Sequence, residues 1–186
     1  MNKISMGAKT LLYPMTMTMI GANVDSRPNY LAAGWCTIIE HAPAMFLFST
    51  TRMRYTVQGI LQNKTFSVNI PSTKMAKVTD YVGLYSGKVV DKSQLFTNFY
   101  GKLHTAPMIE ECPVNLECKL VQTVKFGTEH ELFIGEIIET YVNENCITDN
   151  LADAKKIDPL LITPKDNHYW SINDIVAKAW SVGKTL

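Results

Sequence analysis

The stretch MFLFSTTRMRYT, residues 45–56, joins an apolar run to a group of hydrogen-bond donors. The run MFLF predicts a buried strand. Without an intervening glycine or proline it passes into Ser49, Thr50, Thr51, Arg52 and Arg54, and then into Tyr55 and Thr56. A hydrophobic core does not need these groups, since buried polar atoms cost free energy unless they are paired. We therefore expect the end of this strand to bind a polar ligand.

A helix is predicted to start where the donors end. Val57, Ile60 and Leu61 have helical spacing, and Thr56 is a suitable N-cap. The free N–H groups and the dipole of a helix start favour negative charge. A phosphate monoester, with about −1.5 to −2 charges and three acceptor oxygens, would use this many donors. Composition alone leaves open the alternative that Thr51 or Thr56 only caps the helix and that the arginines are solvated.

Strands are also predicted on the amino-terminal side of this stretch. YPMTMTMIG alternates methionine and threonine, which is strand periodicity, and the turn residues of DSRPN follow it. A second strand follows in NYLAAGWCTIIEH, and HAP, residues 41–43, turns the chain into AMFLFST. Three successive strands with short turns predict an antiparallel meander.

Further strands and helices are predicted on the carboxyl-terminal side. KTFSVNIP is a strand, residues 73–85 suit a helix, and NLECKLVQTVKF, GTEH and ELFIGEIIETYVN form a long hairpin. Ser171 would cap a last amphipathic helix whose apolar face consists of Ile172, Ile175, Val176, Ala179 and Trp180. Because strands dominate and βαβ alternation is scarce, we expect a mainly β fold, a β-barrel with peripheral helices, in one domain over residues 1–186.

Composition limits the class of protein. Of 186 residues, 46% are hydrophobic and 19% charged, and the net charge of +1 gives no electrostatic reason to expect nucleic acid. No apolar run approaches the length of a membrane helix. The cysteines Cys36, Cys112, Cys118 and Cys146 form no C-x-x-C pair, so we expect free thiols, no metal site and a cytoplasmic location.

Two nucleotide signatures are excluded. No G-x-G-x-x-G follows a predicted strand, so a Rossmann site is not indicated. Gly183-Lys184-Thr185 imitates the end of a P-loop, but Lys178 stands where that motif needs a glycine.

The strand that precedes the opening stretch suggests a place for a flat ring. Its segment NYLAAGWCT, residues 29–37, mixes small residues, an aromatic residue and hydrogen-bonding side chains. Trp35 could flank a ring, with Asn29, Cys36 and Thr37 near its polar edge. The alternative is that Trp35 belongs to the core and Asn29 to a turn.

These segments together resemble the flavoredoxin and flavin reductase-like family of the FMN-binding split-barrel fold. The resemblance rests on RPNYLAAGWCTIIEHAPAMFLFSTTRMRYT, FSVNIPS, VDKSQLF, ECPVNLECKLVQTVKFGTEHELFIGEIIE and HYWSINDIVAKAWSVG, which occur in one order over most of the chain. It implies noncovalently bound FMN. The implied phosphate ligands are Ser49, Thr50, Thr51, Arg54 and Thr56, Lys92 would lie near the flavin, and Asn29, Trp35, Cys36 and Thr37 would line its ring.

His130 has two interpretations. The resemblance implies that a residue in the turn of the long hairpin approaches the flavin, where a donor or positive charge would favour the anionic reduced ring. A lone histidine in a turn is otherwise a solvated loop residue.

The resemblance implies electron transfer through FMN, with no side chain acting as a catalyst. Two alternatives stay open: an NAD(P)H-dependent flavin reductase, and a binding module that holds flavin without redox turnover. The expected partners are a second copy of the chain, with the flavin near the subunit interface, and either a redox protein or NAD(P)H as electron donor. A barrel that binds nucleic acid would need a broad basic face, which the near-neutral charge does not indicate.

Overall fold

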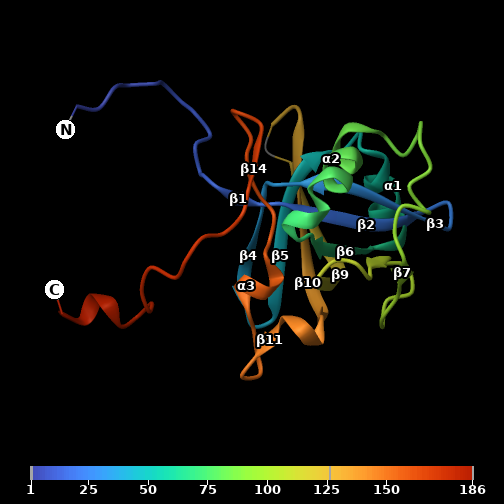
Figure 1. Ribbon diagram of the computed structural model, residues 1–186. Helices are drawn as coiled ribbons and strands as arrows, with labels where there is room; N and C mark the ends of the chain where they lie inside the picture. Colours follow the sequence, from blue (N-terminus) through green and yellow to red (C-terminus); the bar gives the residue numbers. More distant parts are fainter. Residues whose placement is uncertain (1, 126, 186) are drawn as a thin grey trace.

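The computed structural model describes residues 2–125 and 127–185 and has a mostly β architecture, as predicted (Figure 1). Its main element is a seven-stranded antiparallel sheet in the order β3-β2-β6-β9-β10-β5-β4. The strands of this sheet are β2 (Thr18–Val24), β3 (Arg27–Ala33), β4 (Cys36–His41), β5 (Ala44–Thr51), β6 (Thr65–Ile70), β9 (Val114–Lys125) and β10 (His130–Val142).

Smaller elements surround this sheet. A three-stranded sheet consists of β1 (Met15–Thr16), β13 (Leu161–Thr163) and β14 (His168–Trp170). Two short pairs are formed by β7 (Asn98–Phe99) with β8 (Met108–Ile109) and by β11 (Ile147–Thr148) with β12 (Leu151–Ala152). The helices are α1 (Tyr55–Asn63), α2 (Ala76–Leu84) and α3 (Ala154–Ile157), with single 3₁₀ turns at Thr73–Met75, Glu144–Cys146 and Val182–Thr185.

The main sheet curls so that its two edges are joined by a bend in the chain. The prediction of one strand in NYLAAGWCTIIEH is wrong, because the chain bends at Gly34 and Trp35 and divides it into β3 and β4. These two strands lie at opposite ends of the hydrogen-bonded order. The Trp35 carbonyl accepts a hydrogen bond from the Ser49 amide at 2.8 Å, which holds the bend against β5. The result is a split barrel: the sheet curls, but its edge strands β3 and β4 are not hydrogen-bonded to one another.

Aromatic side chains fill the interior. Along β5 the buried residues are Phe46, Phe48 and Thr50, whereas the residues between them face the other side. The ring of Phe48 stacks on Phe133 at 5.1 Å between centroids and meets the edge of Phe66 at 5.4 Å. The prediction of a buried strand in MFLF therefore holds for alternate residues of β5.

The two longer helices pack on opposite faces of the sheet, α1 on the side of the main core and α2 on the other side. α1 lies against β2, and Gly59 permits the close approach: a Cβ there would be 2.1 Å from the Asn23 carbonyl oxygen. α2 lies against β3 and buries Val82 beside Met19 and Tyr30. Because the main core and α1 cover one of its faces and the cluster that contains α2 covers the other, β2 is buried on both faces despite its alternating sequence.

The long hairpin and the helix at residues 73–85 are confirmed, the latter as a 3₁₀ turn followed by α2. Phe126, expected in the first strand of the hairpin, lies outside the described residues. The four cysteines are free thiols. In the described part of the chain, no helix is long and apolar enough to cross a bilayer.

Two local predictions are wrong. Thr56 does not cap α1: the residue before the helix is Arg54, which makes no side-chain cap, and Thr56 lies in the first turn with its side chain bonded elsewhere. The helix expected after Ser171 does not form, and residues 171–178 are irregular. Its apolar residues are largely exposed, and a short amphipathic helix without a surface to pack against is marginal in water.

Candidate functional site

The predicted site residues form two groups that are joined by the passage from β5 to α1. The structure brings Trp35, Cys36, Thr37, Ser49, Thr51 and His130 to the outer side of β4 and β5 and to the adjoining end of β10. Asn29, Arg54, Thr56 and Lys92 line a second, smaller cavity beneath α2. A ligand that uses both groups would have to be elongated, with one end at each.

Most of the first group, but not Thr51 or His130, lines a cleft of about 860 Å³. Trp35, Cys36, Thr37, Leu47 and Ser49 supply one wall, because residues 47 and 49 face outward from β5. Residues 9–16 of the amino-terminal segment supply the other wall. The volume lies within the range of about 300–1,000 Å³ that is typical of small-molecule sites, and most of the lining is apolar.

Trp35 and His130 face one another at this edge. Their ring centroids are 5.0 Å apart, with the planes tilted by 39°. His130 is the first residue of β10 and lies opposite Thr51 in the ladder, so it is half-buried and is not a solvated loop residue. Trp35 is exposed, which rules out its place in the core. Both aromatic rings are therefore held at the surface, beside the cleft.

Cys36 contributes a neutral thiol to this wall. Its sulfur lies 3.8 Å from the Thr18 hydroxyl and 3.7 Å from the Thr16 carbonyl oxygen. Burial raises the pKa of the thiol above its ordinary value. A protonated thiol is a poor nucleophile, so Cys36 suits contact with a ring better than covalent chemistry.

The second group is organised by two interior hydrogen-bond arrangements. Asn29, which is buried and not part of a turn, donates from Nδ2 to the Thr56 hydroxyl at 2.7 Å. The Lys92 ammonium donates to the Tyr30 carbonyl at 2.9 Å and to the Val82 carbonyl at 2.8 Å. Lys92 thereby connects the end of α2 with β3, whose Tyr30 lies 62 residues away in the sequence.

Lys92 is a buried cation beside a second cation. It is 3% exposed, and burial together with the positive charge of Arg54 lowers its pKa to about 8. Within the described residues no carboxylate pairs with it, and only two of its three N–H donors are used. Burial of an unpaired charge is costly, so this group favours an anion that reaches it.

Arg54 lies at the open start of α1. Its guanidinium donates to the Gly83 carbonyl in α2 at 3.3 Å and is otherwise exposed. The first turn of α1 carries no acidic residue and no side-chain cap. The start of α1, together with Arg54 and Lys92, provides positive charge and hydrogen-bond donors for a phosphate group.

The three successive hydroxyls do not share one site. Ser49 faces outward, into the cleft of the first group, whereas Thr50 is buried on the side of Phe48. Thr51 lies beside His130 in a hollow of about 310 Å³ under the tip of the long hairpin. Residues on a strand alternate between faces, so only some of the hydroxyls can contact a given ligand group.

Sequence reasoning missed several residues at these sites. The wall from residues 9–16 has no local signal, because its role depends on contact with a strand far along the chain. Gly87 was missed for the same reason: a Cβ there would lie 2.1 Å from Asn29 Oδ1, so only glycine fits beside that amide in the folded chain. Glu131 is a buried carboxylate that lies 3.3 Å from Arg52. This ion pair gives Arg52 a role apart from the second group, to which Arg54 belongs.

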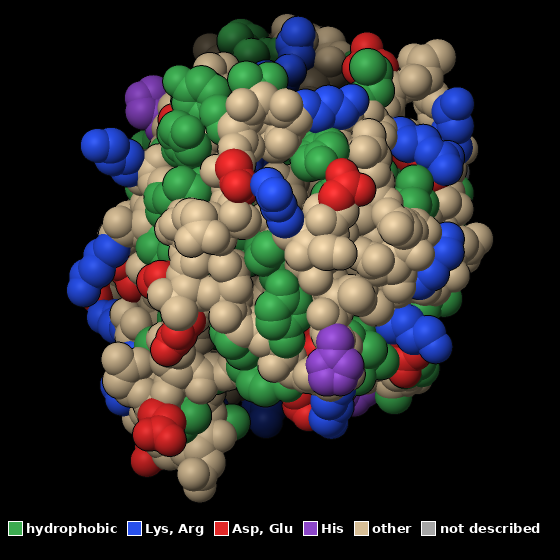
Figure 2. Space-filling view, turned by 90° about the vertical axis from the view of Figure 1, so that its right-hand side faces the viewer, with side chains coloured by type: hydrophobic (Ala, Val, Ile, Leu, Met, Phe, Trp, Pro, Cys, Tyr) green, Lys and Arg blue, Asp and Glu red, His purple; other side chains and the backbone are tan. Residues whose placement is uncertain are grey.

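Charge elsewhere on the surface is mixed. On the face shown in Figure 2, lysine and arginine side chains are interspersed with aspartate and glutamate. This face presents no continuous basic patch of the kind that nucleic-acid barrels use.

Comparisons with known proteins give the family and the fold. The model of the flavin reductase like domain matches residues 10–165. The flavoredoxin from Methanosarcina acetivorans has a similar structure, with 44% identity, a TM-score of 0.95 and coverage of 100% of this chain and 99% of that one. The flavoredoxin of Desulfovibrio vulgaris (Miyazaki F) is 36% identical, with a TM-score of 0.92 and coverage of 98% of this chain and 100% of that one. An uncharacterized protein from Archaeoglobus fulgidus is 32% identical over 129 residues, which cover 68% of this chain and 72% of that protein.

Proposed function

This chain belongs to the flavin reductase-like domain family, and we propose that it holds FMN noncovalently and acts in electron transfer. The observation that carries the proposal is the basic group at Lys92 and Arg54, a buried ammonium and a guanidinium with no carboxylate among the described residues to neutralise Lys92. The likeness to two flavoredoxins over nearly their whole length supports the same conclusion. A flavin supplies reversible uptake of electrons when it is bound.

The residues of the second group would hold the phosphate. Arg54 and the first turn of α1 provide donors from the open side, and Lys92 provides a charge from within. Asn29 fixes the Thr56 hydroxyl, so that this side chain is oriented before the ligand binds. The charge and the donors of this arrangement match a phosphate monoester, which has three acceptor oxygens and up to two negative charges. The cavity itself measures only about 10 Å³, so the phosphate would lie at its mouth, beside the exposed Arg54.

The residues of the first group would orient the ring. Trp35 and Leu47 offer apolar contact, Thr37 and Ser49 offer hydrogen-bonding groups, and His130 adds a donor or acceptor at the edge. No side chain in the cleft needs to act as nucleophile or acid. The neutral thiol of Cys36 is consistent with such a noncatalytic role.

A second copy of the chain completes the proposed assembly, with the flavin near the subunit interface. The support is the exposed edge at β4, where Trp35, Ile38 and Ile39 present apolar surface next to the cleft. Sedimentation of the purified protein checks this part, and a largely monomeric protein at micromolar concentration would contradict it.

The first experiment is an absorption spectrum of the purified protein, with the ligand released by heat compared with FMN and FAD standards. Stoichiometric FMN is the expected result. A colourless protein that also takes up no added FMN would contradict the proposal. Anaerobic mixing with NADH or NADPH then separates the alternatives: rapid bleaching would assign a flavin reductase, and resistance to every donor and acceptor would leave a binding module.

A substitution tests the phosphate site directly. Arg54→Ala is expected to weaken FMN binding about tenfold or more, because one charge-assisted hydrogen bond contributes roughly 1.5–3 kcal/mol and exposure reduces that value. Riboflavin, which lacks the phosphate, should lose less than twofold. Lys102→Ala is the matched control, since it removes one positive charge at an exposed pair with Glu139. Equal losses of FMN and riboflavin would count against the role of Arg54.

A further inference from the structure

All three tryptophans of the chain lie at the surface. Trp35, Trp170 and Trp180 are 42%, 50% and 94% exposed. Tryptophan is highly buried on average, so three exposed tryptophans mark apolar surface that is available to another molecule.

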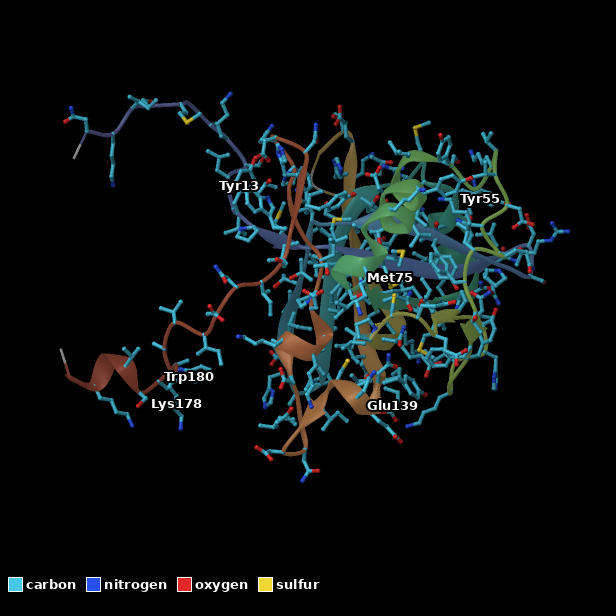
Figure 3. The ribbon with its side chains drawn as sticks, in the orientation of Figure 1. Tyr13, Tyr55, Met75, Glu139, Lys178 and Trp180 are labelled. Carbon is cyan, nitrogen blue, oxygen red and sulfur yellow. The ribbon has the colours of Figure 1, made fainter. Side chains whose placement is uncertain are left out.

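Residues 171–185, here called the C-terminal arm, hold the most exposed of these side chains. The arm leads away from the barrel, and Trp180 and Lys178 lie on it at a distance from the sheet (Figures 1 and 3). Val176 is 99% exposed, and Ile175 is also exposed. An ion pair of 2.8 Å between Lys155 and Asp174 ties the start of the arm to α3. The sequence has the spacing of an amphipathic helix, but its own barrel does not cover the apolar face.

A matching apolar surface lies at the edge of the main sheet. β4 is the last strand of the hydrogen-bonded order, and its residues 37–41 are exposed. Ile38 and Ile39 project from this edge, next to Trp35 at the bend. Figure 1 places β4, β14 and both chain termini on the same side of the molecule. An open edge strand with exposed isoleucines tends to pair with another chain unless something covers it.

We propose that the C-terminal arm of one copy docks on the β4 edge of a second copy and becomes helical there, with the reverse contact made by the other arm. The inference rests on the dimer of the proposed function, but it does not depend on the flavin. Reciprocal exchange fits a two-fold symmetric pair, in which the same patch is used twice. Cys36 and Thr37 of β4 line the ring cleft, so the arm of the partner would also close the open side of that cleft.

The two surfaces supply a substantial part of the area that a specific interface needs. A buried aromatic side chain removes about 150–250 Å² from water, so the exposed parts of Trp35 and Trp180 amount to roughly 200–340 Å². A standard interface buries about 800 Å² on each partner. These two tryptophans thus supply about a quarter to two fifths of that area, and the isoleucines of β4 and the aliphatic residues of the arm add to it.

The test compares Trp180→Asn with Lys178→Asn in the full chain. Both positions lie in the arm and far from the core (Figure 3). In the proposed helix, the spacing would put Lys178 opposite the apolar face. Sedimentation over a dilution series should show a dimer that dissociates about tenfold or more readily for Trp180→Asn, since buried tryptophans contribute strongly to interfaces. Lys178→Asn should match the unaltered protein. Amide hydrogen exchange in residues 172–182 should be slow at dimer concentrations and fast on dilution.

Each outcome decides between the possibilities. Equal dimer strength for the two variants would overturn the inference, as would a monomeric unaltered protein. Exchange protection that persists in the monomer would also overturn it, because the arm would then fold onto its own barrel. The flavin content of the same samples keeps the two proposals apart: a colourless dimer that needs Trp180 contradicts the FMN function alone, whereas an FMN-bound dimer indifferent to Trp180 contradicts the arm exchange alone.

Discussion

The pH dependence of FMN affinity follows from the buried lysine. Without ligand, the Lys92 ammonium is enclosed by β3 and α2, and its pKa is lowered to about 8. We predict that FMN affinity falls as the pH rises above 8, whereas riboflavin affinity does not. Only FMN carries a phosphate that interacts with the ammonium, and this interaction is lost when Lys92 gives up its proton.

The sign and size of the effect come from linkage. A bound phosphate stabilises the protonated lysine, so the complex holds a proton that the free protein releases above pH 8. Each pH unit above 8 then weakens FMN about tenfold, or about 1.4 kcal/mol. If the phosphate returns the pKa to its ordinary 10.5, the full effect spans about 2.5 units, or roughly 3.4 kcal/mol.

The same lowered pKa makes the ligand-free protein more stable as the pH rises, whereas it makes FMN binding weaker. Between pH 8 and 10.5 the unfolded chain binds more protons at Lys92 than the folded chain does, so the contribution of this residue to the free energy of unfolding increases with pH in that window. Below pH 8 both states are protonated, and the cost of the buried charge is fully present.

The assay is a titration of the protein with FMN and with riboflavin at constant ionic strength, followed by flavin fluorescence from pH 7 to 9.5. The phosphate is a dianion throughout, since its second pKa is about 6. The ratio of the two affinities removes any titration of the ring, which both ligands share. Arg54→Gln should move the midpoint of the ratio to higher pH, because Arg54 is one cause of the lowered pKa of Lys92. Parallel pH curves for FMN and riboflavin would refute the reasoning.

Two further predictions concern stability. Phe48→Ala should lower the free energy of unfolding by about 3–5 kcal/mol in urea denaturation, because it removes a ring packed against Phe66 and Phe133, whereas Val121→Ala on an exposed part of β9 should change it by less than about 0.5 kcal/mol. Gly87→Ala should cost about 1–3 kcal/mol and weaken FMN binding, because the new Cβ would displace Asn29 from Thr56. An unchanged melting temperature in Gly87→Ala would contradict that close approach.

Local sequence patterns predicted much of the secondary structure. The alternation in the long hairpin, the apolar run of β5 and the helical spacing after Thr56 each depend on neighbours in the chain, and all three elements form. The same locality explains the errors. Several residues of the passage could precede the first helical turn, and Thr56 was chosen as the cap of α1 on its side-chain type alone. The helix after Ser171 was predicted from its spacing, but such a helix forms only against a surface on which its apolar face can pack.

The candidate site was predictable in part. Its residue types pointed to a phosphate and a ring, and the family resemblance is confirmed by the match over residues 10–165. The division into two groups was not predictable from composition, because it depends on the strand alternation that turns Ser49 outward and Thr50 inward. Nor was the contact between His130 and Trp35, which brings the start of β10 against the bend that follows β3.

The sequence by itself determined most strands of the main sheet and the first two helices, since these follow from periodicity. The donors of residues 49–56 led to the prediction of a phosphate ligand, which rests on side-chain chemistry. Only the tertiary structure decided that β3 and β4, adjacent in the chain, lie at opposite edges of the sheet. It also decided that Lys92 is buried between β3 and α2, where its pKa falls. The physical reason is that burial and the electrostatic environment are set by contacts between distant segments, which no local pattern contains.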